Sequence, residues 1–111
     1  MTEYVLKIEA SKDKFSEISR ILKVEPSKSK FFWELSIDEN NDLYVKAIDY
    51  FISIIENKFQ ELKELDINND NISVWFYKSY TGQCNIEFSP SEMKKLSQND
   101  ITLCISCWEE E

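Results

Sequence analysis

The sequence of 111 residues contains no histidine and only one glycine, Gly82. Histidine is the usual general base near neutral pH and the commonest metal ligand, so its absence excludes histidine triads and ordinary zinc sites. A single glycine excludes the glycine-rich loops that hold nucleotide phosphates. No serine lies in a recognisable nucleophile motif either. We therefore expect a protein that is not an enzyme, with no cofactor and no metal site.

Long apolar runs are also missing, and the start of the chain, MTEYVLKIEA, has no basic stretch followed by an apolar segment. These features predict a cytoplasmic protein that does not enter a membrane. The odd number of cysteines fits a reducing compartment and free thiols. Cys104 and Cys107 have the spacing of a redox pair, but on a strand they face opposite sides, so we expect them to serve packing.

Basic residues are few: 13 Lys and Arg stand against 21 Asp and Glu, a net charge of −8. This balance repels phosphate backbones and excludes nucleic acid as an expected partner. The acidity is concentrated, because residues 1–30 carry +2 and residues 31–111 carry −10. Two interpretations stay open: a basic protein as partner, or an acidic surface that serves only solubility.

The hydrophobic pattern of the first half alternates between strand and helix periods. Period-two alternation predicts two strands, and apolar residues at helical spacing predict two helices, the first ending before Pro26. Asn41 or Asp42 is the expected N-cap of the second, strongly amphipathic helix. In chain order the ranges are a strand at Tyr4–Ala10, a helix from Phe15 to before Glu25, a strand at Phe31–Ile37 and a long helix at Leu43–Leu65.

The second half predicts a hairpin of Ile72–Tyr80 and Gln83–Phe88, turning at Thr81-Gly82. Ser89-Pro90-Ser91-Glu92 has the form of a capping box and predicts a helix that ends near Asn99. A last strand at Ile101–Trp108 and an acidic tail, Glu109–Glu111, complete the order βαβαββαβ. The fold class is α+β, one domain over residues 1–111, with a mostly antiparallel sheet of about five strands and helices packed on one face.

Several pieces of this layout resemble the bacterial domain-of-unknown-function family numbered 4279. They are the strand YVLKIEA, the helix end ILKVEP, the aromatic FFWELSI, and the finish from Phe88-Ser89-Pro90 to Trp108. Family members usually carry glycine before the equivalents of Val24 and Ile101, where this sequence has Lys23 and Asp100. The resemblance implies architecture rather than activity and nominates no catalytic residue. Similar small acidic domains occur among bacterial immunity proteins.

Four aromatic residues fall on the less aliphatic faces of their predicted strands: Phe32, Trp75, Tyr77 and Trp108. Aromatic side chains supply much of the binding energy in protein interfaces, so this row is the candidate partner-binding site. The alternative is that a loop or tail covers the row and makes it part of the core.

The sequence thus predicts a small acidic module that binds a protein, with an immunity-like role as one form of it. The partner is either a basic protein or a second copy of the chain. The alternative function is binding of a small ligand in a pocket between the sheet and the long helix, lined by Phe51, Ile55, Phe59 and Trp33. Core packing explains the same four residues.

Overall fold

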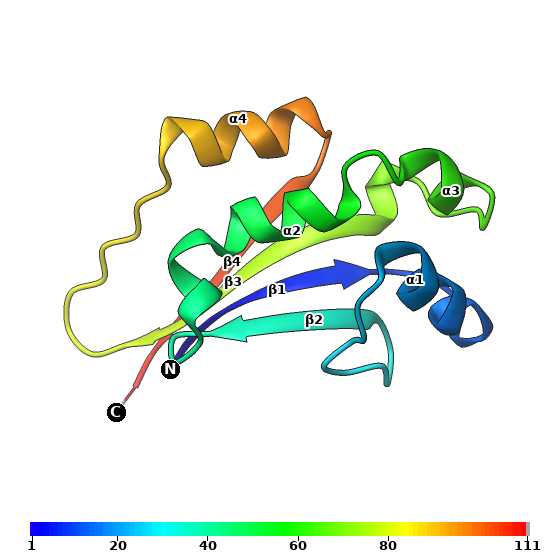
Figure 1. The fold of residues 1–111 in the computed structure, drawn as a ribbon. Helices are drawn as coiled ribbons and strands as arrows, with labels where there is room; N and C mark the ends of the chain where they lie inside the picture. Colours follow the sequence, from blue (N-terminus) through cyan, green and yellow to red (C-terminus); the bar gives the residue numbers. More distant parts are fainter. Residues whose placement is uncertain (111) are drawn as a thin grey trace.

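The computed structural model describes residues 1–110, which form a four-stranded mixed sheet with helices on one face (Figure 1). The strand order is β2-β1-β3-β4. Strand β1 is antiparallel to both β2 and β3, whereas β3 and β4 are parallel. The strands are β1 at Thr2–Ile8, β2 at Trp33–Asp38, β3 at Ile72–Tyr80 and β4 at Thr102–Glu109.

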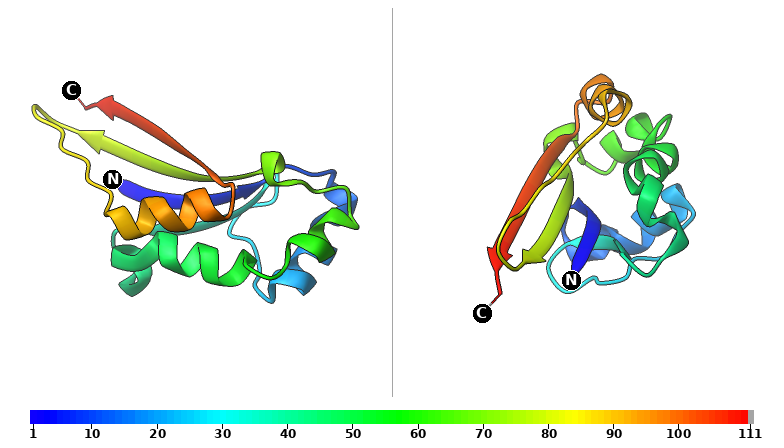
Figure 2. Two further views of the ribbon diagram at one scale, coloured as in Figure 1. Left: turned by 90° about the horizontal axis from the view of Figure 1, so that it is seen from above. Right: turned by 90° about the vertical axis from the view of Figure 1, so that its left-hand side faces the viewer.

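In the described residues, all four α-helices lie on the same side of the sheet and no helix lies on the other side (Figure 2). Their bounds are α1 at Phe15–Leu22, α2 at Ala47–Ile55, α3 at Phe59–Lys63 and α4 at Pro90–Gln98. The structure also has three 3₁₀ helices next to them: η1 at Lys12–Lys14, η2 at Asp42–Lys46 and η3 at Asn69–Asn71. Within residues 1–110, every helix is too short or too polar to cross a membrane.

The core lies between the helices and the near face of the sheet. Alternate strand residues point into it, as period-two patterning predicts, and Trp33, Leu6 and Val74 are completely buried. The indole Nε1 of Trp33 donates a hydrogen bond of 3.0 Å to the Ser19 hydroxyl on α1, which satisfies its polar atom. On the opposite face of the sheet Val5 and Ser79 are also buried, while the other strand residues there are half-buried or exposed.

The predicted hairpin at Thr81-Gly82 is wrong, and so is the fifth strand at Gln83–Phe88. Residues 83–88 are extended but pair with no strand. They carry the chain from the end of β3 to α4, so β4 returns parallel to β3 (Figure 1). Their alternation has a different cause: Cys84, Ile86 and Phe88 are half-buried while the residues between them are exposed. The sheet is therefore mixed and four-stranded, not mostly antiparallel and five-stranded.

The single helix predicted over Leu43–Leu65 is interrupted. It is divided into η2, α2 and α3, with an extended residue at Glu56 and left-handed backbone at Asn57. A straight helix of that length spans about 35 Å, longer than the roughly 23 Å of seven-residue β1. The break keeps Leu62 of α3 completely buried in the core.

Two predicted helix caps are confirmed. The Ser89 hydroxyl accepts from the Glu92 N–H, and the Glu92 carboxylate accepts from the Ser89 N–H, at 3.1 and 2.8 Å. The Asn41 side chain accepts from the Leu43 N–H at 2.8 Å and caps η2.

Predicted strand ends are off by up to two residues. Strand β1 begins and ends two residues earlier than predicted, and β2 begins at Trp33 rather than Phe31, so Phe32 lies just before it. Glu109 belongs to β4 rather than to the acidic tail. Residue 111 of that tail lies outside the described residues.

Lys23 and Asp100 have left-handed backbone, with φ of 60° and 55°. These are the two positions where the family that the sequence resembles carries glycine. A residue with a Cβ atom adopts this conformation at an energetic cost that glycine avoids.

We expect Lys23→Gly combined with Asp100→Gly to raise the free energy of unfolding by about 1 kcal/mol, measured by urea denaturation. The matched control is Lys94→Gly in the middle of α4, which we expect to lower it by about 1 kcal/mol. Equal losses from the double variant and from the control would contradict this interpretation of the backbone.

Candidate functional site

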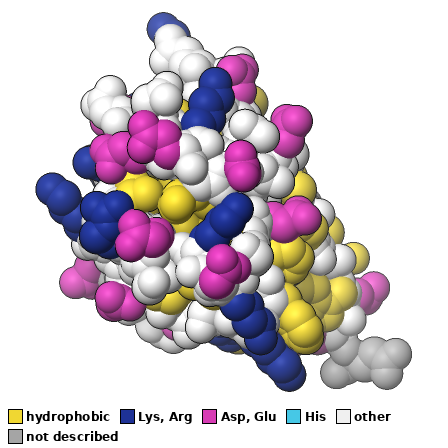
Figure 3. Space-filling view, turned by 90° about the vertical axis from the view of Figure 1, so that its right-hand side faces the viewer, with side chains coloured by type: hydrophobic (Ala, Val, Ile, Leu, Met, Phe, Trp, Pro, Cys, Tyr) yellow, Lys and Arg dark blue, Asp and Glu magenta, His cyan; other side chains and the backbone are white. Residues whose placement is uncertain are grey.

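The open face of the sheet is the candidate site. It carries the side chains that alternate with the core residues, and no helix of residues 1–110 lies on it (Figure 2). Figure 3 shows hydrophobic side chains gathered along the sheet side of the molecule, next to charged ones. Of the four predicted aromatic residues, Phe32, Trp75 and Tyr77 are half-buried and Trp108 is exposed.

Three of the four predicted aromatic residues come together around one lysine. The ammonium nitrogen of Lys7 lies 4.3 Å from the ring centre of Trp75, 5.2 Å from that of Tyr77 and 5.6 Å from that of Phe32. The rings of Trp75 and Tyr77 are stacked at 5.7 Å with an angle of 14°. These distances are those of cation–π contacts, so the cluster is held together by charge as well as by packing.

The cluster is further fixed by two polar contacts. The carboxylate of Glu34 on β2 lies 3.6 Å from the Lys7 ammonium, and both side chains are mostly buried. The Trp75 indole Nε1 donates to the Ser73 hydroxyl at 2.9 Å. The rings of Trp75 and Tyr77 are thus held in place on a strand in the middle of the sheet, as an ordered interface anchor requires.

Trp108 lies apart from this cluster. In the register of β3 and β4 it is opposite Ser79, two residues beyond the pair Tyr77 and Ser106. Its side chain is 47% exposed, on the edge strand β4. The four predicted residues therefore share one face but form two contact points: the aromatic cluster of Phe32, Trp75 and Tyr77, and Trp108 near the C-terminal end.

Lys7 and Glu34 were not predicted as site residues. The period of β1 already placed Lys7 on the polar face, but its neighbours depend on the register between three strands. That register puts Lys7 between Glu34 on one side and Ser73 on the other. A local sequence pattern reports which face of a strand is buried but does not identify the neighbouring strands.

A small pocket of about 130 Å³ adjoins the aromatic cluster. Its walls include the rings of Phe32 and Trp75, and its margin includes the exposed carboxylates of Glu9 and Asp70. Lys7 also lines it but is already paired with Glu34. Two rings and two free carboxylates form a suitable environment for a basic side chain of another molecule.

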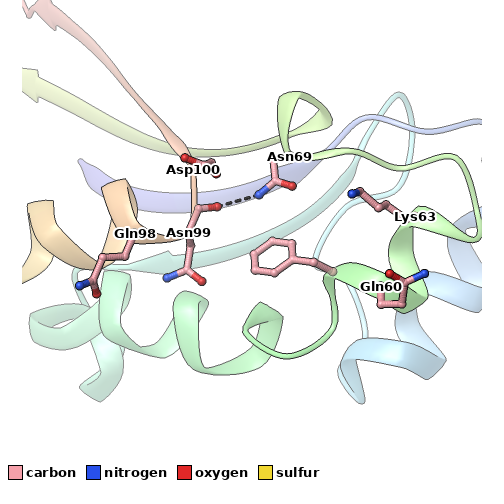
Figure 4. Close-up of a pocket in the computed structure, with 7 residues that line it drawn as sticks. Gln60, Lys63, Asn69, Gln98, Asn99 and Asp100 are labelled. Carbon is pink, nitrogen blue, oxygen red and sulfur yellow. Dashed lines mark hydrogen bonds between the residues drawn. The ribbon is translucent and has the colours of Figure 1, made fainter.

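The predicted ligand pocket between the sheet and the long helix is mostly core. Trp33, Phe51 and Ile55 are completely buried among apolar neighbours. Only Phe59 reaches a surface pocket, of about 250 Å³, at the start of α3 (Figure 4). The other residues that line it are polar: Gln60, Lys63, Asn69, Gln98, Asn99 and Asp100.

That polar pocket is partly organised by its own hydrogen bonds. The Asn69 amide donates to the Asn99 carbonyl at 2.7 Å (Figure 4), and the Asn99 amide donates to the Lys95 carbonyl at 2.7 Å. The remaining amide groups of Gln60 and Gln98 are exposed. The pocket can therefore offer donors, acceptors and one ring to a small polar molecule.

The three cysteines are free thiols: Cys84 and Cys104 are half-buried, and Cys107 is exposed. Among residues 1–110, no three acidic or cysteine side chains come together as a group that could hold a metal ion.

No protein-family model, curated protein or solved structure matches this chain. The resemblance to family 4279 stays a prediction, and function has to be argued from the structure alone.

Proposed function

We propose that this protein is a non-enzymatic, cytoplasmic protein-binding module that uses the open face of its sheet. The contact residues are Phe32, Trp75 and Tyr77 of the aromatic cluster, together with Trp108. An immunity-like role, in which a small acidic protein binds and blocks a basic one, is one form of this function.

The observation that carries the proposal is an ordered set of large aromatic side chains on a sheet face that no described helix covers. Protein interfaces are enriched in tryptophan and tyrosine. Trp108 is the strongest single anchor, because nearly half of its side chain is exposed.

Charge favours a basic partner over a second copy of the chain. Each molecule carries −8, and residues 31–111 contribute −10. The pocket beside the aromatic cluster adds the carboxylates of Glu9 and Asp70. Complementary charge accelerates encounter and discriminates against partners of the same sign, including a second copy.

A second candidate function is binding of a small polar molecule in the pocket lined by Phe59 and its amide neighbours. Aromatic rings flanked by amides can hold a ligand through stacking and hydrogen bonds. Thermal-shift screening of polar metabolites tests it, because a ligand at about 100 times its dissociation constant adds about 2.7 kcal/mol of stability. Unchanged melting throughout the screen would remove this candidate.

We expect Trp108→Ala to weaken the capture of the partner from native cells by at least about tenfold, because an exposed tryptophan anchor is lost. Quantitative mass spectrometry of proteins retained by the tagged chain measures this. The control is Val45→Ala, at an apolar residue that is 84% exposed in η2 on the helix side.

Both variants should melt within a few degrees of the unmodified protein, since neither residue belongs to the core. Equal retention by the two variants would contradict the proposal, and so would a folded monomer that retains nothing above background.

A further inference from the structure

The two edges of the sheet differ in how they are protected. Along β2, the Glu34 carbonyl accepts from the N–H groups of Ser27 and Lys28, and the Glu34 N–H donates to the Lys28 carbonyl. The Ser36 N–H donates to the Ser27 hydroxyl at 3.0 Å. The chain thus covers the edge of β2 with its own loop, which is a common defence against unwanted strand pairing.

The other edge, along β4, has no such cover among residues 1–110. The Glu110 N–H donates to the Tyr80 carbonyl at 2.7 Å, which shows that even-numbered residues of this segment point their backbone groups at β3. Since these groups alternate along a strand, the odd-numbered residues direct their N–H and C=O groups outward. They are Leu103, Ile105, Cys107 and Glu109.

Strand β4 also lacks the features that discourage pairing. Its eight residues include no proline and no lysine, and its register with β3 runs without a bulge. Ile105 is 50% exposed on the helix side of the sheet, and Trp108 is 47% exposed on the open face. An added strand would bury apolar surface on both faces, besides satisfying four outward pairs of backbone groups.

Acidic residues at both ends of β4 determine which kind of partner strand can pair with this edge. Glu109 is the last residue of β4, Glu110 follows it, and Asp100 lies just before the strand begins. All three are exposed. If two copies of the chain paired antiparallel through β4, the end with Glu109 and Glu110 would lie beside Asp100 of the other copy. The two chains, each with a net charge of −8, would also repel each other. A strand with basic residues at both ends meets acidic groups at both ends instead.

From this geometry we propose that the outer edge of β4 binds an extended segment of a partner protein as a fifth strand, apolar in the middle and basic at both ends. The inference rests on the proposed protein-binding function and adds the chemistry of the partner. Backbone hydrogen bonds supply affinity, Ile105 and Trp108 provide apolar contacts, and the acidic ends select the charge.

The test selects peptides of about 12 residues from a random display library on the purified full-length protein. We expect the enriched peptides to alternate β-forming residues between lysines or arginines at both ends. Replacing these basic residues by glutamate in a synthetic version should weaken binding by at least about tenfold, measured by fluorescence anisotropy.

Amide exchange measured by NMR locates the site. The bound peptide should slow exchange of the outward amides of Leu103, Ile105, Cys107 and Glu109. It should leave the amides of Cys104 and Ser106 unchanged, because β3 already protects them.

Two variants at Ile105 distinguish the contribution of backbone hydrogen bonds to peptide binding from that of the side chain. Ile105→Pro removes an outward N–H without removing a bond to β3, and we expect it to weaken peptide binding by at least about tenfold. Ile105→Thr keeps the N–H and loses only part of the apolar side chain, so it should weaken binding clearly less than Ile105→Pro does. If the proline variant does not fold, the amide exchange of the unmodified protein still shows whether the peptide pairs with the outer edge of β4.

The proposal is overturned if no peptide is enriched, if enriched peptides lack basic ends, or if the protected amides lie elsewhere. It is also overturned if the protein dimerises by light scattering and protects the same four amides, since the occupant is then a second copy. Retention of the cellular partner by Ile105→Pro but not by Trp108→Ala would leave the protein-binding function standing and make only the edge pairing wrong.

Discussion

Replacing Trp33 by alanine should lower the free energy of unfolding by about 3–5 kcal/mol, a large part of the roughly 5–15 kcal/mol that stabilises a typical domain. The Trp33 side chain is completely buried, so the substitution leaves a cavity under α1 that neighbouring side chains fill only in part. It also leaves the Ser19 hydroxyl without its donor. Urea denaturation followed by circular dichroism measures the loss.

Trp108→Ala is the matched comparison, because it removes the same atoms from an exposed position. We expect a loss of less than about 1 kcal/mol there. Comparable losses at both positions would mean that Trp108 belongs to a core that the structure does not show, and the aromatic face would lose its functional interpretation.

Reversing two carboxylates beside the aromatic cluster should weaken binding of the basic partner by about 100-fold. The variant is Glu9→Lys with Asp70→Lys, at two exposed residues that border the pocket of Phe32 and Trp75. The effect should fall mainly on the association rate and should shrink at high salt, since exposed charges act over a Debye length of about 10 Å. Surface plasmon resonance with the captured partner measures both rates.

The control for this variant reverses two carboxylates on the helix side, Glu61→Lys with Glu64→Lys, both exposed near the end of α3. It changes the net charge of the chain by the same amount. If it weakens binding as much as the pocket variant, then overall charge and not the open face governs the encounter.

The elements that the sequence predicted well are those with strong local signals. Strand β3 has the predicted bounds, α4 begins at the predicted capping box, and Gly82 has the positive φ that its position suggested. In each case the signal is a contact or a conformation within a few residues. Such signals do not depend on how distant segments pair.

The two wrong predictions, a strand at residues 83–88 and one long helix at residues 43–65, each came from a hydrophobic pattern that two different structures can produce. Residues 83–88 alternate because an extended segment packs one side on the molecule, with Phe88 against Phe76 at 5.8 Å, and not because it pairs as a strand. The helical period of residues 43–65 continues through Asn57, although the left-handed backbone there divides the helix. Period alone reports which side is buried and says nothing about hydrogen-bond partners.

In the candidate site, too, the features with a local sequence signal were predicted, and those that depend on strand pairing were not. Strand period placed Trp75, Tyr77 and Trp108 on one face, and the register of β3 and β4 confirms it. Phe32 lies just before β2 rather than in it and joins the cluster through Lys7. The role of Lys7 at the centre of three rings depends on the register of β1 with β2 and β3. The free edge of β4 depends on the strand order β2-β1-β3-β4, for which no prediction was made.

The most direct test of the account is photo-crosslinking in native cells with a benzophenone amino acid placed singly at position 108 or at position 45. Both residues are exposed, on the open face and on the helix side respectively. We expect crosslinks from position 108 to one basic protein and no such product from position 45. Identical products from both positions, or products from position 45 alone, would contradict the claim that the open sheet face binds the partner.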